Sequence, residues 1–372
     1  MRGYYLSSPW EDPVSHGGAT LKDLAEKLDV SIATVSRALA GHDRIAKSTR
    51  ARIEAAAREI GYIPNRAARA LVSGRSGFAA MVLPAEEAGG EAVPPGLFRA
   101  LSAGCAQIGM DFFLASVPPG QSELAVIEQI VRARKADGLL LLAAGDDDPR
   151  LAFLAQRRFP FVTLGSPPRG APDQPWVDTD GFAAFERAFT LLRGLGHRRF
   201  GLVGPSDPSP SCRRRHDGLL AAIARSGDTS IEVGSVALHG DDIGRSRRAI
   251  RALLSRPARP TAVLGLTDAA ALDVMEEAER LGLSVPRDLS VIGFGNDPAA
   301  AHFRPGLTTF DADPVHCASC AAELLAERIE AGPDAAPPLA RVLRPRLVIR
   351  SSHGPAPRAG TTGAALCESQ PA

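Results

Sequence analysis

The stretch ATLKDLAEKLDVSIATVSRALAGHDRIAKSTRARIEAAAREIGYIPNRAARALVSGRS, residues 19–76, decides how the first part of the chain folds. Thr20 is followed three positions later by Asp23, a pattern similar to a capping box that predicts the start of a helix. Asp29 tolerates the left-handed backbone conformation that a tight turn needs. Ser31 is a favourable N-cap for a second helix, IATVSRAL. Two short helices joined by a turn of a few residues predict a helix-turn-helix motif.

A third helix is expected in the same stretch, at roughly residues 48–60, because apolar residues recur there at helical spacing. Its apolar stripe consists of Ile53, Ala56, Ala57 and Ile60. Gly61 ends this helix, and Pro64 prevents it from restarting at once. The sequence therefore predicts a small, all-α headpiece.

Positive charge is concentrated in this first stretch. Residues 19–76 contain eleven Lys and Arg against six Asp and Glu, which gives a net charge of +5. The whole chain has a formal net charge of only +1, so the remaining residues sum to about −4. A basic module on a mildly acidic body indicates that only the module meets phosphate groups.

The length and composition are those of a globular protein of more than one domain. The chain has 372 residues, which suits two or three domains. It contains no run of about 18 apolar residues that would predict a membrane span, and residues 1–18 lack the pattern of a secretion signal. We expect residues 1–18 to be a flexible extension. Five scattered cysteines favour a reducing cytoplasm over a disulfide framework; they are Cys105, Cys212, Cys317, Cys320 and Cys367.

Short apolar runs alternate with amphipathic segments from Phe78 onward. The expected strands are 78–83, 112–117, 138–143, 159–165, 199–205, 261–266 and 289–294. The expected helices lie near 97–108, 122–135, 181–195, 214–226, 243–255 and 268–281. This alternation implies an α/β body with parallel sheets and helices on both sheet faces. Ligands of such sheets bind outside the carboxyl ends of the strands, so two such lobes predict a binding site between them.

Three segments interrupt this alternation. GGEAVPPG at 89–96 is interpreted as a loop, and DTSIEVGS at 228–235 as a connection or an edge strand. Residues 351–372 are rich in Pro, Gly and small polar residues, which predicts a disordered tail. CASC at 317–320 has the spacing of a metal or redox pair, but without a second pair it favours a helix that packs small residues.

Several motifs resemble those of one known family. DVSIATVSRAL and IGYIPNRAARAL, at this spacing, resemble the headpiece of the lactose and galactose repressor (LacI/GalR) family of transcriptional regulators. LRGLGHRRFGLVGP at 192–205, RRRHDG at 213–218 and LGLTDAAAL at 264–272 resemble the family's sensor. The resemblance continues to about residue 350. It implies a helix-turn-helix headpiece followed by a two-lobed α/β sensor that is similar to periplasmic binding proteins.

The resemblance also implies how the chain is divided. The expected parts are a headpiece at 19–64, a hinge helix and linker at 65–76, and an effector-binding and dimerisation domain at 77–350. Within that domain, the N-lobe is expected at about 77–179 and 312–338, and the C-lobe at about 180–311 and 339–350.

A recognition helix that enters the major groove presents its first turns to the base edges. By the family motif, Ile32, Ala33 and Arg37 face the bases, and Arg37 suits guanine because it can donate two hydrogen bonds. The short polar side chains suit phosphate oxygens. The expected DNA contacts are Thr20, Ser31, Ile32, Ala33, Thr34, Ser36, Arg37, Arg44, Asn65, Ala68 and Leu71.

NRAARALV at 65–72 corresponds to the family's hinge helix, which folds on the operator and lies in the minor groove. Leu71 aligns with the leucine that is wedged into the central base step, and Ala68 is small enough for the groove floor. Two hinge helices act together in the family. The resemblance therefore implies a homodimer and a near-palindromic, double-stranded DNA operator.

The sensor motifs indicate which side chains would bind an effector. Arg215 aligns with an arginine that donates to ligand oxygens, and Asp268 aligns with an aspartate that accepts from ligand hydroxyls. The chain departs from the family at GFGN, where Gly295 replaces a ligand-reading acid. The expected effector contacts are Trp176, Asp180, Arg215, Asp242, Asp268 and Asn296. A tryptophan with carboxylates suits a carbohydrate, and the segments around them resemble carbohydrate-responsive members.

Other functions remain open at this point. A corepressor-type regulator that senses a nucleobase would use the same fold. A solute-binding protein without a gene-regulatory role is another class, although residues 20–71 oppose it. An enzyme is not expected, because the sequence shows no nucleophile elbow, phosphate loop or HExxH motif. His197 is interpreted as support for a helix end rather than a catalytic base. No metal or cofactor is expected.

Overall fold

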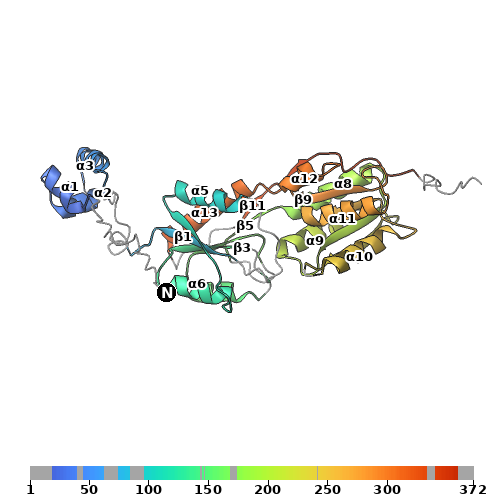
Figure 1. Cartoon of the computed structure of the whole chain (residues 1–372), viewed down its shortest axis with the longest axis horizontal. Helices are drawn as coiled ribbons and strands as arrows, with labels where there is room; N and C mark the ends of the chain where they lie inside the picture. The colour runs from blue at the N-terminus through green and yellow to red at the C-terminus, as the bar shows by residue number, and fades with distance from the viewer. Residues whose placement is uncertain are drawn as a thin grey trace, which may run out of the picture. The chain divides into compact units, whose positions relative to one another are not determined.

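The computed structural model describes residues 19–39, 45–62, 74–83, 96–142, 145, 147–167, 174–240, 242–332 and 340–358. The chain divides into two compact units, Met1–Gly77 and Phe78–Ala372 (Figure 1). Among the described residues, no helix is both long and apolar enough to cross a membrane.

The first unit is the predicted headpiece of three helices, α1 (Leu21–Leu28), α2 (Ile32–Leu39) and α3 (Lys47–Glu59). Each helix contributes apolar side chains to one small core, in which Leu24, Val35 and Ile53 are fully buried. The periodicity-based predictions for all three helices are confirmed.

Local capping explains where these helices begin and end. Thr20 and Asp23 form a full capping box, in which the Thr20 N–H donates to the Asp23 carboxylate at 2.7 Å. Asp29 ends α1 in the left-handed conformation, with φ of +54°. The Thr34 N–H donates to Ser31 Oγ at 3.1 Å, so Ser31 caps α2. The sequence predicted each of these three features.

The second unit contains two six-stranded sheets. The N-lobe sheet has the strand order β11-β5-β4-β3-β1-β2 and is parallel throughout. The C-lobe sheet has the order β12-β10-β9-β8-β6-β7, and only β12 runs antiparallel to its neighbour β10.

The N-lobe elements are β1 (Phe78–Val82), α5 (Leu97–Gln107), β2 (Asp111–Ala115), α6 (Glu123–Arg132), β3 (Gly138–Leu142), α7 (Pro149–Gln156), β4 (Phe161–Leu164), β5 (Trp176–Thr179), α13 (Pro314–Ala331) and β11 (Arg341–Leu343). The C-lobe elements are α8 (Gly181–Gly194), β6 (Arg199–Pro205), α9 (Pro210–Ser226), β7 (Glu232–Leu238), α10 (Ile243–Leu254), β8 (Ala262–Gly265), α11 (Asp268–Arg280), β9 (Ser290–Gly295), α12 (Pro298–His302), β10 (Thr308–Asp311) and β12 (Arg346–Val348).

Helices cover both faces of each sheet, as the strand–helix alternation predicted. Successive residues of β1 point to opposite faces, so Met81 joins the core under α5 and α13 while Ala80 joins the core under α6 and α7 (Figure 1). In the C-lobe, α8 and α9 pack on one face, and α10 and α11 pack on the other. Cys317 and Cys320 are buried in α13, which confirms the interpretation of CASC as a packed helix.

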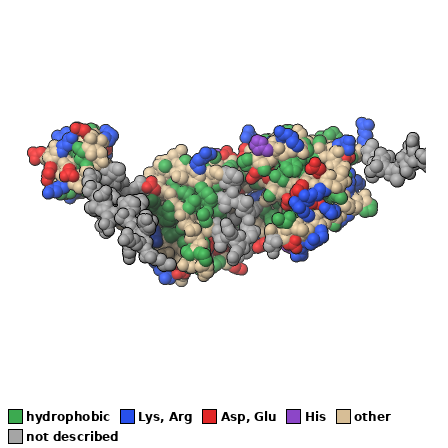
Figure 2. All heavy atoms as spheres, in the orientation of Figure 1, with side chains coloured by type: hydrophobic (Ala, Val, Ile, Leu, Met, Phe, Trp, Pro, Cys, Tyr) green, Lys and Arg blue, Asp and Glu red, His purple; other side chains and the backbone are tan. Residues whose placement is uncertain are grey.

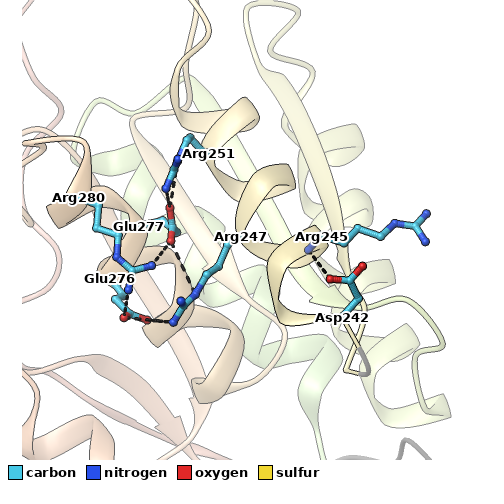
Figure 3. A network of polar contacts seen from close by, with 7 residues as sticks. All are labelled: Asp242, Arg245, Arg247, Arg251, Glu276, Glu277 and Arg280. Atoms are coloured by element: carbon cyan, nitrogen blue, oxygen red, sulfur yellow. Dashed lines mark hydrogen bonds and ion pairs between the residues drawn. The ribbon is translucent and has the colours of Figure 1, made fainter.

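An ion-pair network joins α10 to α11 on the outer side of the C-lobe (Figure 3). Glu277 is fully buried and accepts from Arg251 Nη2 at 3.0 Å and from Arg280. Burial disfavours its charged form, but the hydrogen bonds from Arg280 and Arg251 outweigh burial and hold the pKa of Glu277 below its usual value. Figure 2 shows basic side chains gathered over this part of the C-lobe. The buried Glu277 carboxylate pairs with Arg251 of α10 and Arg280 of α11, so it links the two helices.

The expected assignment of residues 339–350 to the C-lobe is wrong for β11. Val342 of β11 pairs with Asp178 of β5 in the N-lobe sheet, whereas Leu347 of β12 pairs with Phe310 in the C-lobe sheet. The last crossing of the chain between the lobes therefore lies between β11 and β12, rather than before residue 339. A three-residue strand has no periodicity to detect, so its sheet is decided by tertiary pairing.

The predicted disordered tail is also wrong for residues 351–358, which pack on the C-lobe. Ser352 is fully buried; its Oγ donates to Val291 O at 2.6 Å and accepts from Thr308 N at 2.7 Å. His197 Nε2 lies 3.0 Å from Gly354 O. Small polar side chains suggested disorder by composition, but here they satisfy buried backbone groups of neighbouring strands. Residues 359–372 lie outside the described part of the chain.

Candidate functional site

Helix α2 presents one face to the headpiece core and the opposite face outward. Val35 and Ala38 are buried, whereas Ala33 and Arg37 are exposed and Ile32 is 49% exposed. The exposed side of α2 thus carries both apolar side chains and a guanidinium group. Basic and acidic side chains are mixed over the rest of this unit (Figure 2).

The small polar residues around α2 have local structural roles. Ser31 Oγ lies 2.8 Å from Thr34 Oγ1 in addition to capping the helix. The Thr20 hydroxyl donates to Asp23 at 2.8 Å as part of the capping box. Ser36 is partly exposed on α2. Ser31 and Thr20 therefore fix the starts of α2 and α1, respectively. The predicted contacts Arg44, Asn65, Ala68 and Leu71 lie outside the described residues.

In the second unit, Arg215 of α9 reaches the carboxyl end of β8. The side chain is 6% exposed, its Nη1 donates to Leu266 O, and its guanidinium lies 4.2 Å from the ring centroid of Phe294 in β9. A Cβ on Gly181 would lie 2.6 Å from Arg215 Cγ. Glycine at this position therefore leaves the space that the arginine stem occupies.

Asp268 begins α11 directly after β8, and it is 3% exposed. Its carboxylate accepts from Thr309 Oγ1 at 2.5 Å and from Asp297 N at 2.7 Å. Burial raises the pKa of Asp268 above its ordinary value, although these two hydrogen bonds oppose the rise. Both carboxylate oxygens are thus engaged, and in this conformation Asp268 holds the turn after β9 against β10.

Asn296 follows β9 and adopts the left-handed conformation, with φ of +56°. Its N–H points to Thr309 Oγ1 at 3.4 Å, and its Oδ1 accepts from Arg350 Nη2 at 2.7 Å. Arg215, Asp268 and Asn296 therefore lie at one edge of the C-lobe sheet, at the carboxyl ends of β8 and β9. This is the edge at which open parallel sheets bind ligands.

The other three predicted effector residues begin helices or lie in the N-lobe sheet. Asp242 is exposed and caps α10 by accepting from Arg245 N at 2.7 Å (Figure 3). Asp180 caps α8 by accepting from Ala183 N at 3.1 Å. Trp176 is partly buried in β5 of the N-lobe sheet. Sequence spacing could not separate a carboxylate that caps a helix from one that faces a ligand, because both follow a strand.

One cluster that the sequence did not predict connects the two lobes. Asp178 Oδ2 accepts from Ser166 N at 2.9 Å, from Ser166 Oγ at 2.5 Å and from Ser211 Oγ at 2.7 Å. Ser166 and Asp178 belong to the N-lobe, whereas Ser211 lies on α9, four residues before Arg215. The contact spans 33 residues of sequence between Asp178 and Ser211, so no local pattern reveals it.

A second unpredicted cluster lies at the carboxyl end of β3. Arg150 of α7 pairs with Glu123 of α6 at 2.5 Å and with Asp148 at 2.6 Å, and its Nη2 lies 3.4 Å from Leu142 O. Burial disfavours the charged guanidinium, but the two carboxylates outweigh burial and raise the pKa of Arg150. The cluster fixes the starts of α6 and α7 at the carboxyl-terminal edge of the N-lobe sheet.

Comparison with known proteins identifies the family. A model for bacterial regulatory proteins of the lacI family matches residues 20–65, and a model for a periplasmic binding protein-like domain matches residues 189–353. The HTH-type transcriptional regulator AglR of Rhizobium meliloti (strain 1021) is 32% identical over 347 residues, covering 91% of this chain and 95% of AglR. The chain belongs to the lacI family of bacterial regulatory proteins. The predicted family and fold class are thereby confirmed.

Other members support the same assignment. The HTH-type transcriptional repressor CytR of Escherichia coli (strain K12) is 32% identical over 299 residues, covering 78% of this chain and 84% of CytR. The solved structure of the transcriptional regulator CelR–cellobiose complex is 28% identical, with a TM-score of 0.65, and covers 90% of this chain and 99% of that chain. These lacI-family relatives are regulators, and none of the three is named as an enzyme.

Proposed function

We propose that this lacI-family member is a DNA-binding transcriptional repressor, and that a small carbohydrate bound between its lobes controls its operator affinity. The observation that carries the DNA-binding part is the outward face of α2, where Ile32, Ala33 and Arg37 are exposed on a helix whose other face is buried. Such a helix fits the major groove. The protein would act as a homodimer on a near-palindromic site in the cytoplasm.

The chemistry of this face suggests what it recognises. Arg37 carries a fork of donors that suits the O6 and N7 acceptors of guanine, whereas Ile32 and Ala33 suit the methyl group of thymine. The partly exposed Ser36 suits a phosphate oxygen. A mixed polar and apolar face of this kind supports sequence-specific binding over a purely electrostatic contact.

Replacing Arg37 by alanine tests the DNA-binding part. We expect the affinity for double-stranded DNA from upstream of the protein's own gene to fall by about 1–3 kcal/mol, because one bidentate base contact is lost. Fluorescence anisotropy at a fixed salt concentration measures this change. Arg58→Ala is the matched control, since it removes the same charge from an exposed position on α3. Equal losses for both variants, or no specific binding by the unaltered protein, would refute the proposal.

Two features of the C-lobe edge support a carbohydrate effector. Arg215 and Asn296 provide hydrogen-bonding groups at the carboxyl ends of β8 and β9, which suits a ligand rich in hydroxyl groups. One face of Phe294 is covered by the Arg215 guanidinium, so that face is not available to stack on a flat base. The similarity to the CelR–cellobiose structure agrees with a sugar.

A ligand screen by calorimetry tests the effector class. The panel would contain cellobiose, maltose, sucrose and trehalose, together with hypoxanthine, adenosine and cytidine. We expect heat of binding from at least one disaccharide and none from the bases and nucleosides. Binding of a purine or a nucleoside instead would replace the carbohydrate with a nucleobase-type effector, while the DNA-binding result would stand.

A further inference from the structure

The C-terminal strap, which we define as residues 350–356, begins beside the candidate effector site. Arg350 N donates to Thr308 Oγ1 at 2.9 Å, and Arg350 Nη1 donates to Leu307 O at 2.8 Å. Its Nη2 donates to Asn296 Oδ1 at 2.7 Å. The strap is anchored further along, where Ser352 is fully buried. The Leu307 carbonyl, just before β10, therefore holds the guanidinium in a position from which it donates to the Asn296 side chain.

The Arg350 contact decides which end of the Asn296 carboxamide faces outward. An arginine side chain can only donate, so the Asn296 atom that it contacts must be the carbonyl oxygen. The Nδ2 group keeps its two N–H donors, and no hydrogen bond among the described residues uses them. With Arg350 in place, Asn296 therefore presents donors rather than an acceptor.

The backbone of Asn296 is fixed by the same small network. Asp268 Oδ2 accepts from Asp297 N at 2.7 Å, and Asp268 Oδ1 accepts from Thr309 Oγ1 at 2.5 Å. A Cβ on Gly293 would lie 2.3 Å from Asp268 Oδ1, so the carboxylate sits directly against the β9 backbone. Gly295 carries no side chain, which leaves Asn296 as the first polar side chain after β9.

We propose that Arg350 is a positioning residue of the effector site, which turns the Asn296 Nδ2 donors toward an oxygen atom of the bound effector. This inference rests on the proposed function, since it assumes that the effector binds at this edge. It adds a requirement on the ligand, which must place an acceptor, such as a sugar hydroxyl or ring oxygen, opposite Asn296. It also gives the strap a role in recognition.

The orientation of Asn296 can be measured without any ligand. The chain contains only two asparagines, Asn65 and Asn296, so the full-length protein labelled with ¹⁵N-asparagine gives only two side-chain amide pairs. An Asn65→Gln variant assigns them. Arg350→Met keeps the aliphatic stem but removes the donors, and we expect it to shift the Asn296 amide signals toward those of a solvated asparagine. Arg350→Lys should restore part of the shift.

Arg346→Met is the matched control for this experiment. Arg346 lies four residues earlier in β12, is exposed, and pairs with Asp311 at 3.1 Å. It should leave the Asn296 signals unchanged. Unaltered Asn296 signals in Arg350→Met, or equal shifts in Arg350→Met and Arg346→Met, would overturn the positioning role.

Binding measurements test the link to recognition. We expect Arg350→Met to weaken binding of the disaccharide found in the calorimetric panel by about tenfold, the effect of one lost hydrogen bond. Asn296→Asp, which still pairs with Arg350 but has no N–H to donate, should weaken it similarly. In an Asn296→Ala background, Arg350→Met should cost little more, because the two side chains act through one contact.

The outcomes separate this inference from the proposed function. Additive losses in the double variant would mean that Arg350 affects binding independently of Asn296, which would overturn the inference while the carbohydrate proposal stands. Thermal unfolding of each variant provides the stability for that comparison. If the unaltered protein binds no sugar in the panel, the carbohydrate proposal fails, and the amide signals still decide whether Arg350 orients Asn296.

Discussion

Replacing Gly218 by alanine is expected to destabilise the C-lobe by about 3 kcal/mol, the upper part of the range for overpacking. A Cβ at this position would lie 2.3 Å from Phe182 O and 2.8 Å from Phe182 Cα. These are backbone atoms at the start of α8, so no side-chain rotation relieves the clash, and α8 and α9 must move apart. Urea unfolding of the full-length protein measures the change.

Gly194→Ala is the matched control for this prediction. Gly194 ends α8, and a Cβ there would meet nothing within 4 Å. The added methyl group should therefore be neutral or slightly stabilising, because alanine favours a helix over glycine by roughly 0.5–1 kcal/mol. Similar stabilities for the Gly218→Ala and Gly194→Ala variants would show that the approach of α9 to α8 is not tight.

The Gly218 position also gives a physical reason for the spacing of Arg215 and Gly218 in RRRHDG. Arg215 and Gly218 lie one helical turn apart on α9, and both face α8. Gly218 permits the close approach of the two helices, and Gly181 on α8 leaves room for the Arg215 stem. The spacing of Arg215 and Gly218 therefore also serves helix packing.

The sequence predicted the elements whose signals are local. The Thr20 capping box, the left-handed Asp29 and the boundaries of β6 at 199–205 depend on neighbouring residues, and they agree with the structure. In contrast, β11, the docked strap and the Asp178 cluster depend on partners far along the chain. Short strands and small polar residues carry no periodicity that identifies such partners.

Only the part of the candidate effector site that follows from strand order could be predicted from the sequence. Arg215, Asp268 and Asn296 come together because parallel strands end at one sheet edge, and that rule needs only strand order. Asp180 and Asp242 also follow strands, but each caps the helix that comes next. Arg350 was not predicted as a site residue, because its contact with Asn296 joins side chains 54 positions apart in the sequence.

Replacing Arg215 by methionine is expected to weaken the response to effector strongly and to leave operator binding intact. Hydrogen bonds from a charged group contribute about 1.5–3 kcal/mol, so effector affinity should fall roughly 10- to 150-fold. Calorimetry measures the affinity for the disaccharide, and anisotropy measures the operator complex with and without it. Methionine fills the space of the arginine stem beside Gly181, which limits the loss of packing.

Two further variants distinguish recognition from packing at this position. Arg214→Met removes the neighbouring arginine, whose side chain is exposed and whose Nη2 lies 4.0 Å from Asp180 Oδ1. We expect this variant to respond to effector like the unaltered protein. Arg215→Lys keeps the charge but not the fork of donors, and we expect an intermediate affinity. If Arg215→Met still released or bound operator in response to the disaccharide, the effector would have to bind away from β8 and β9.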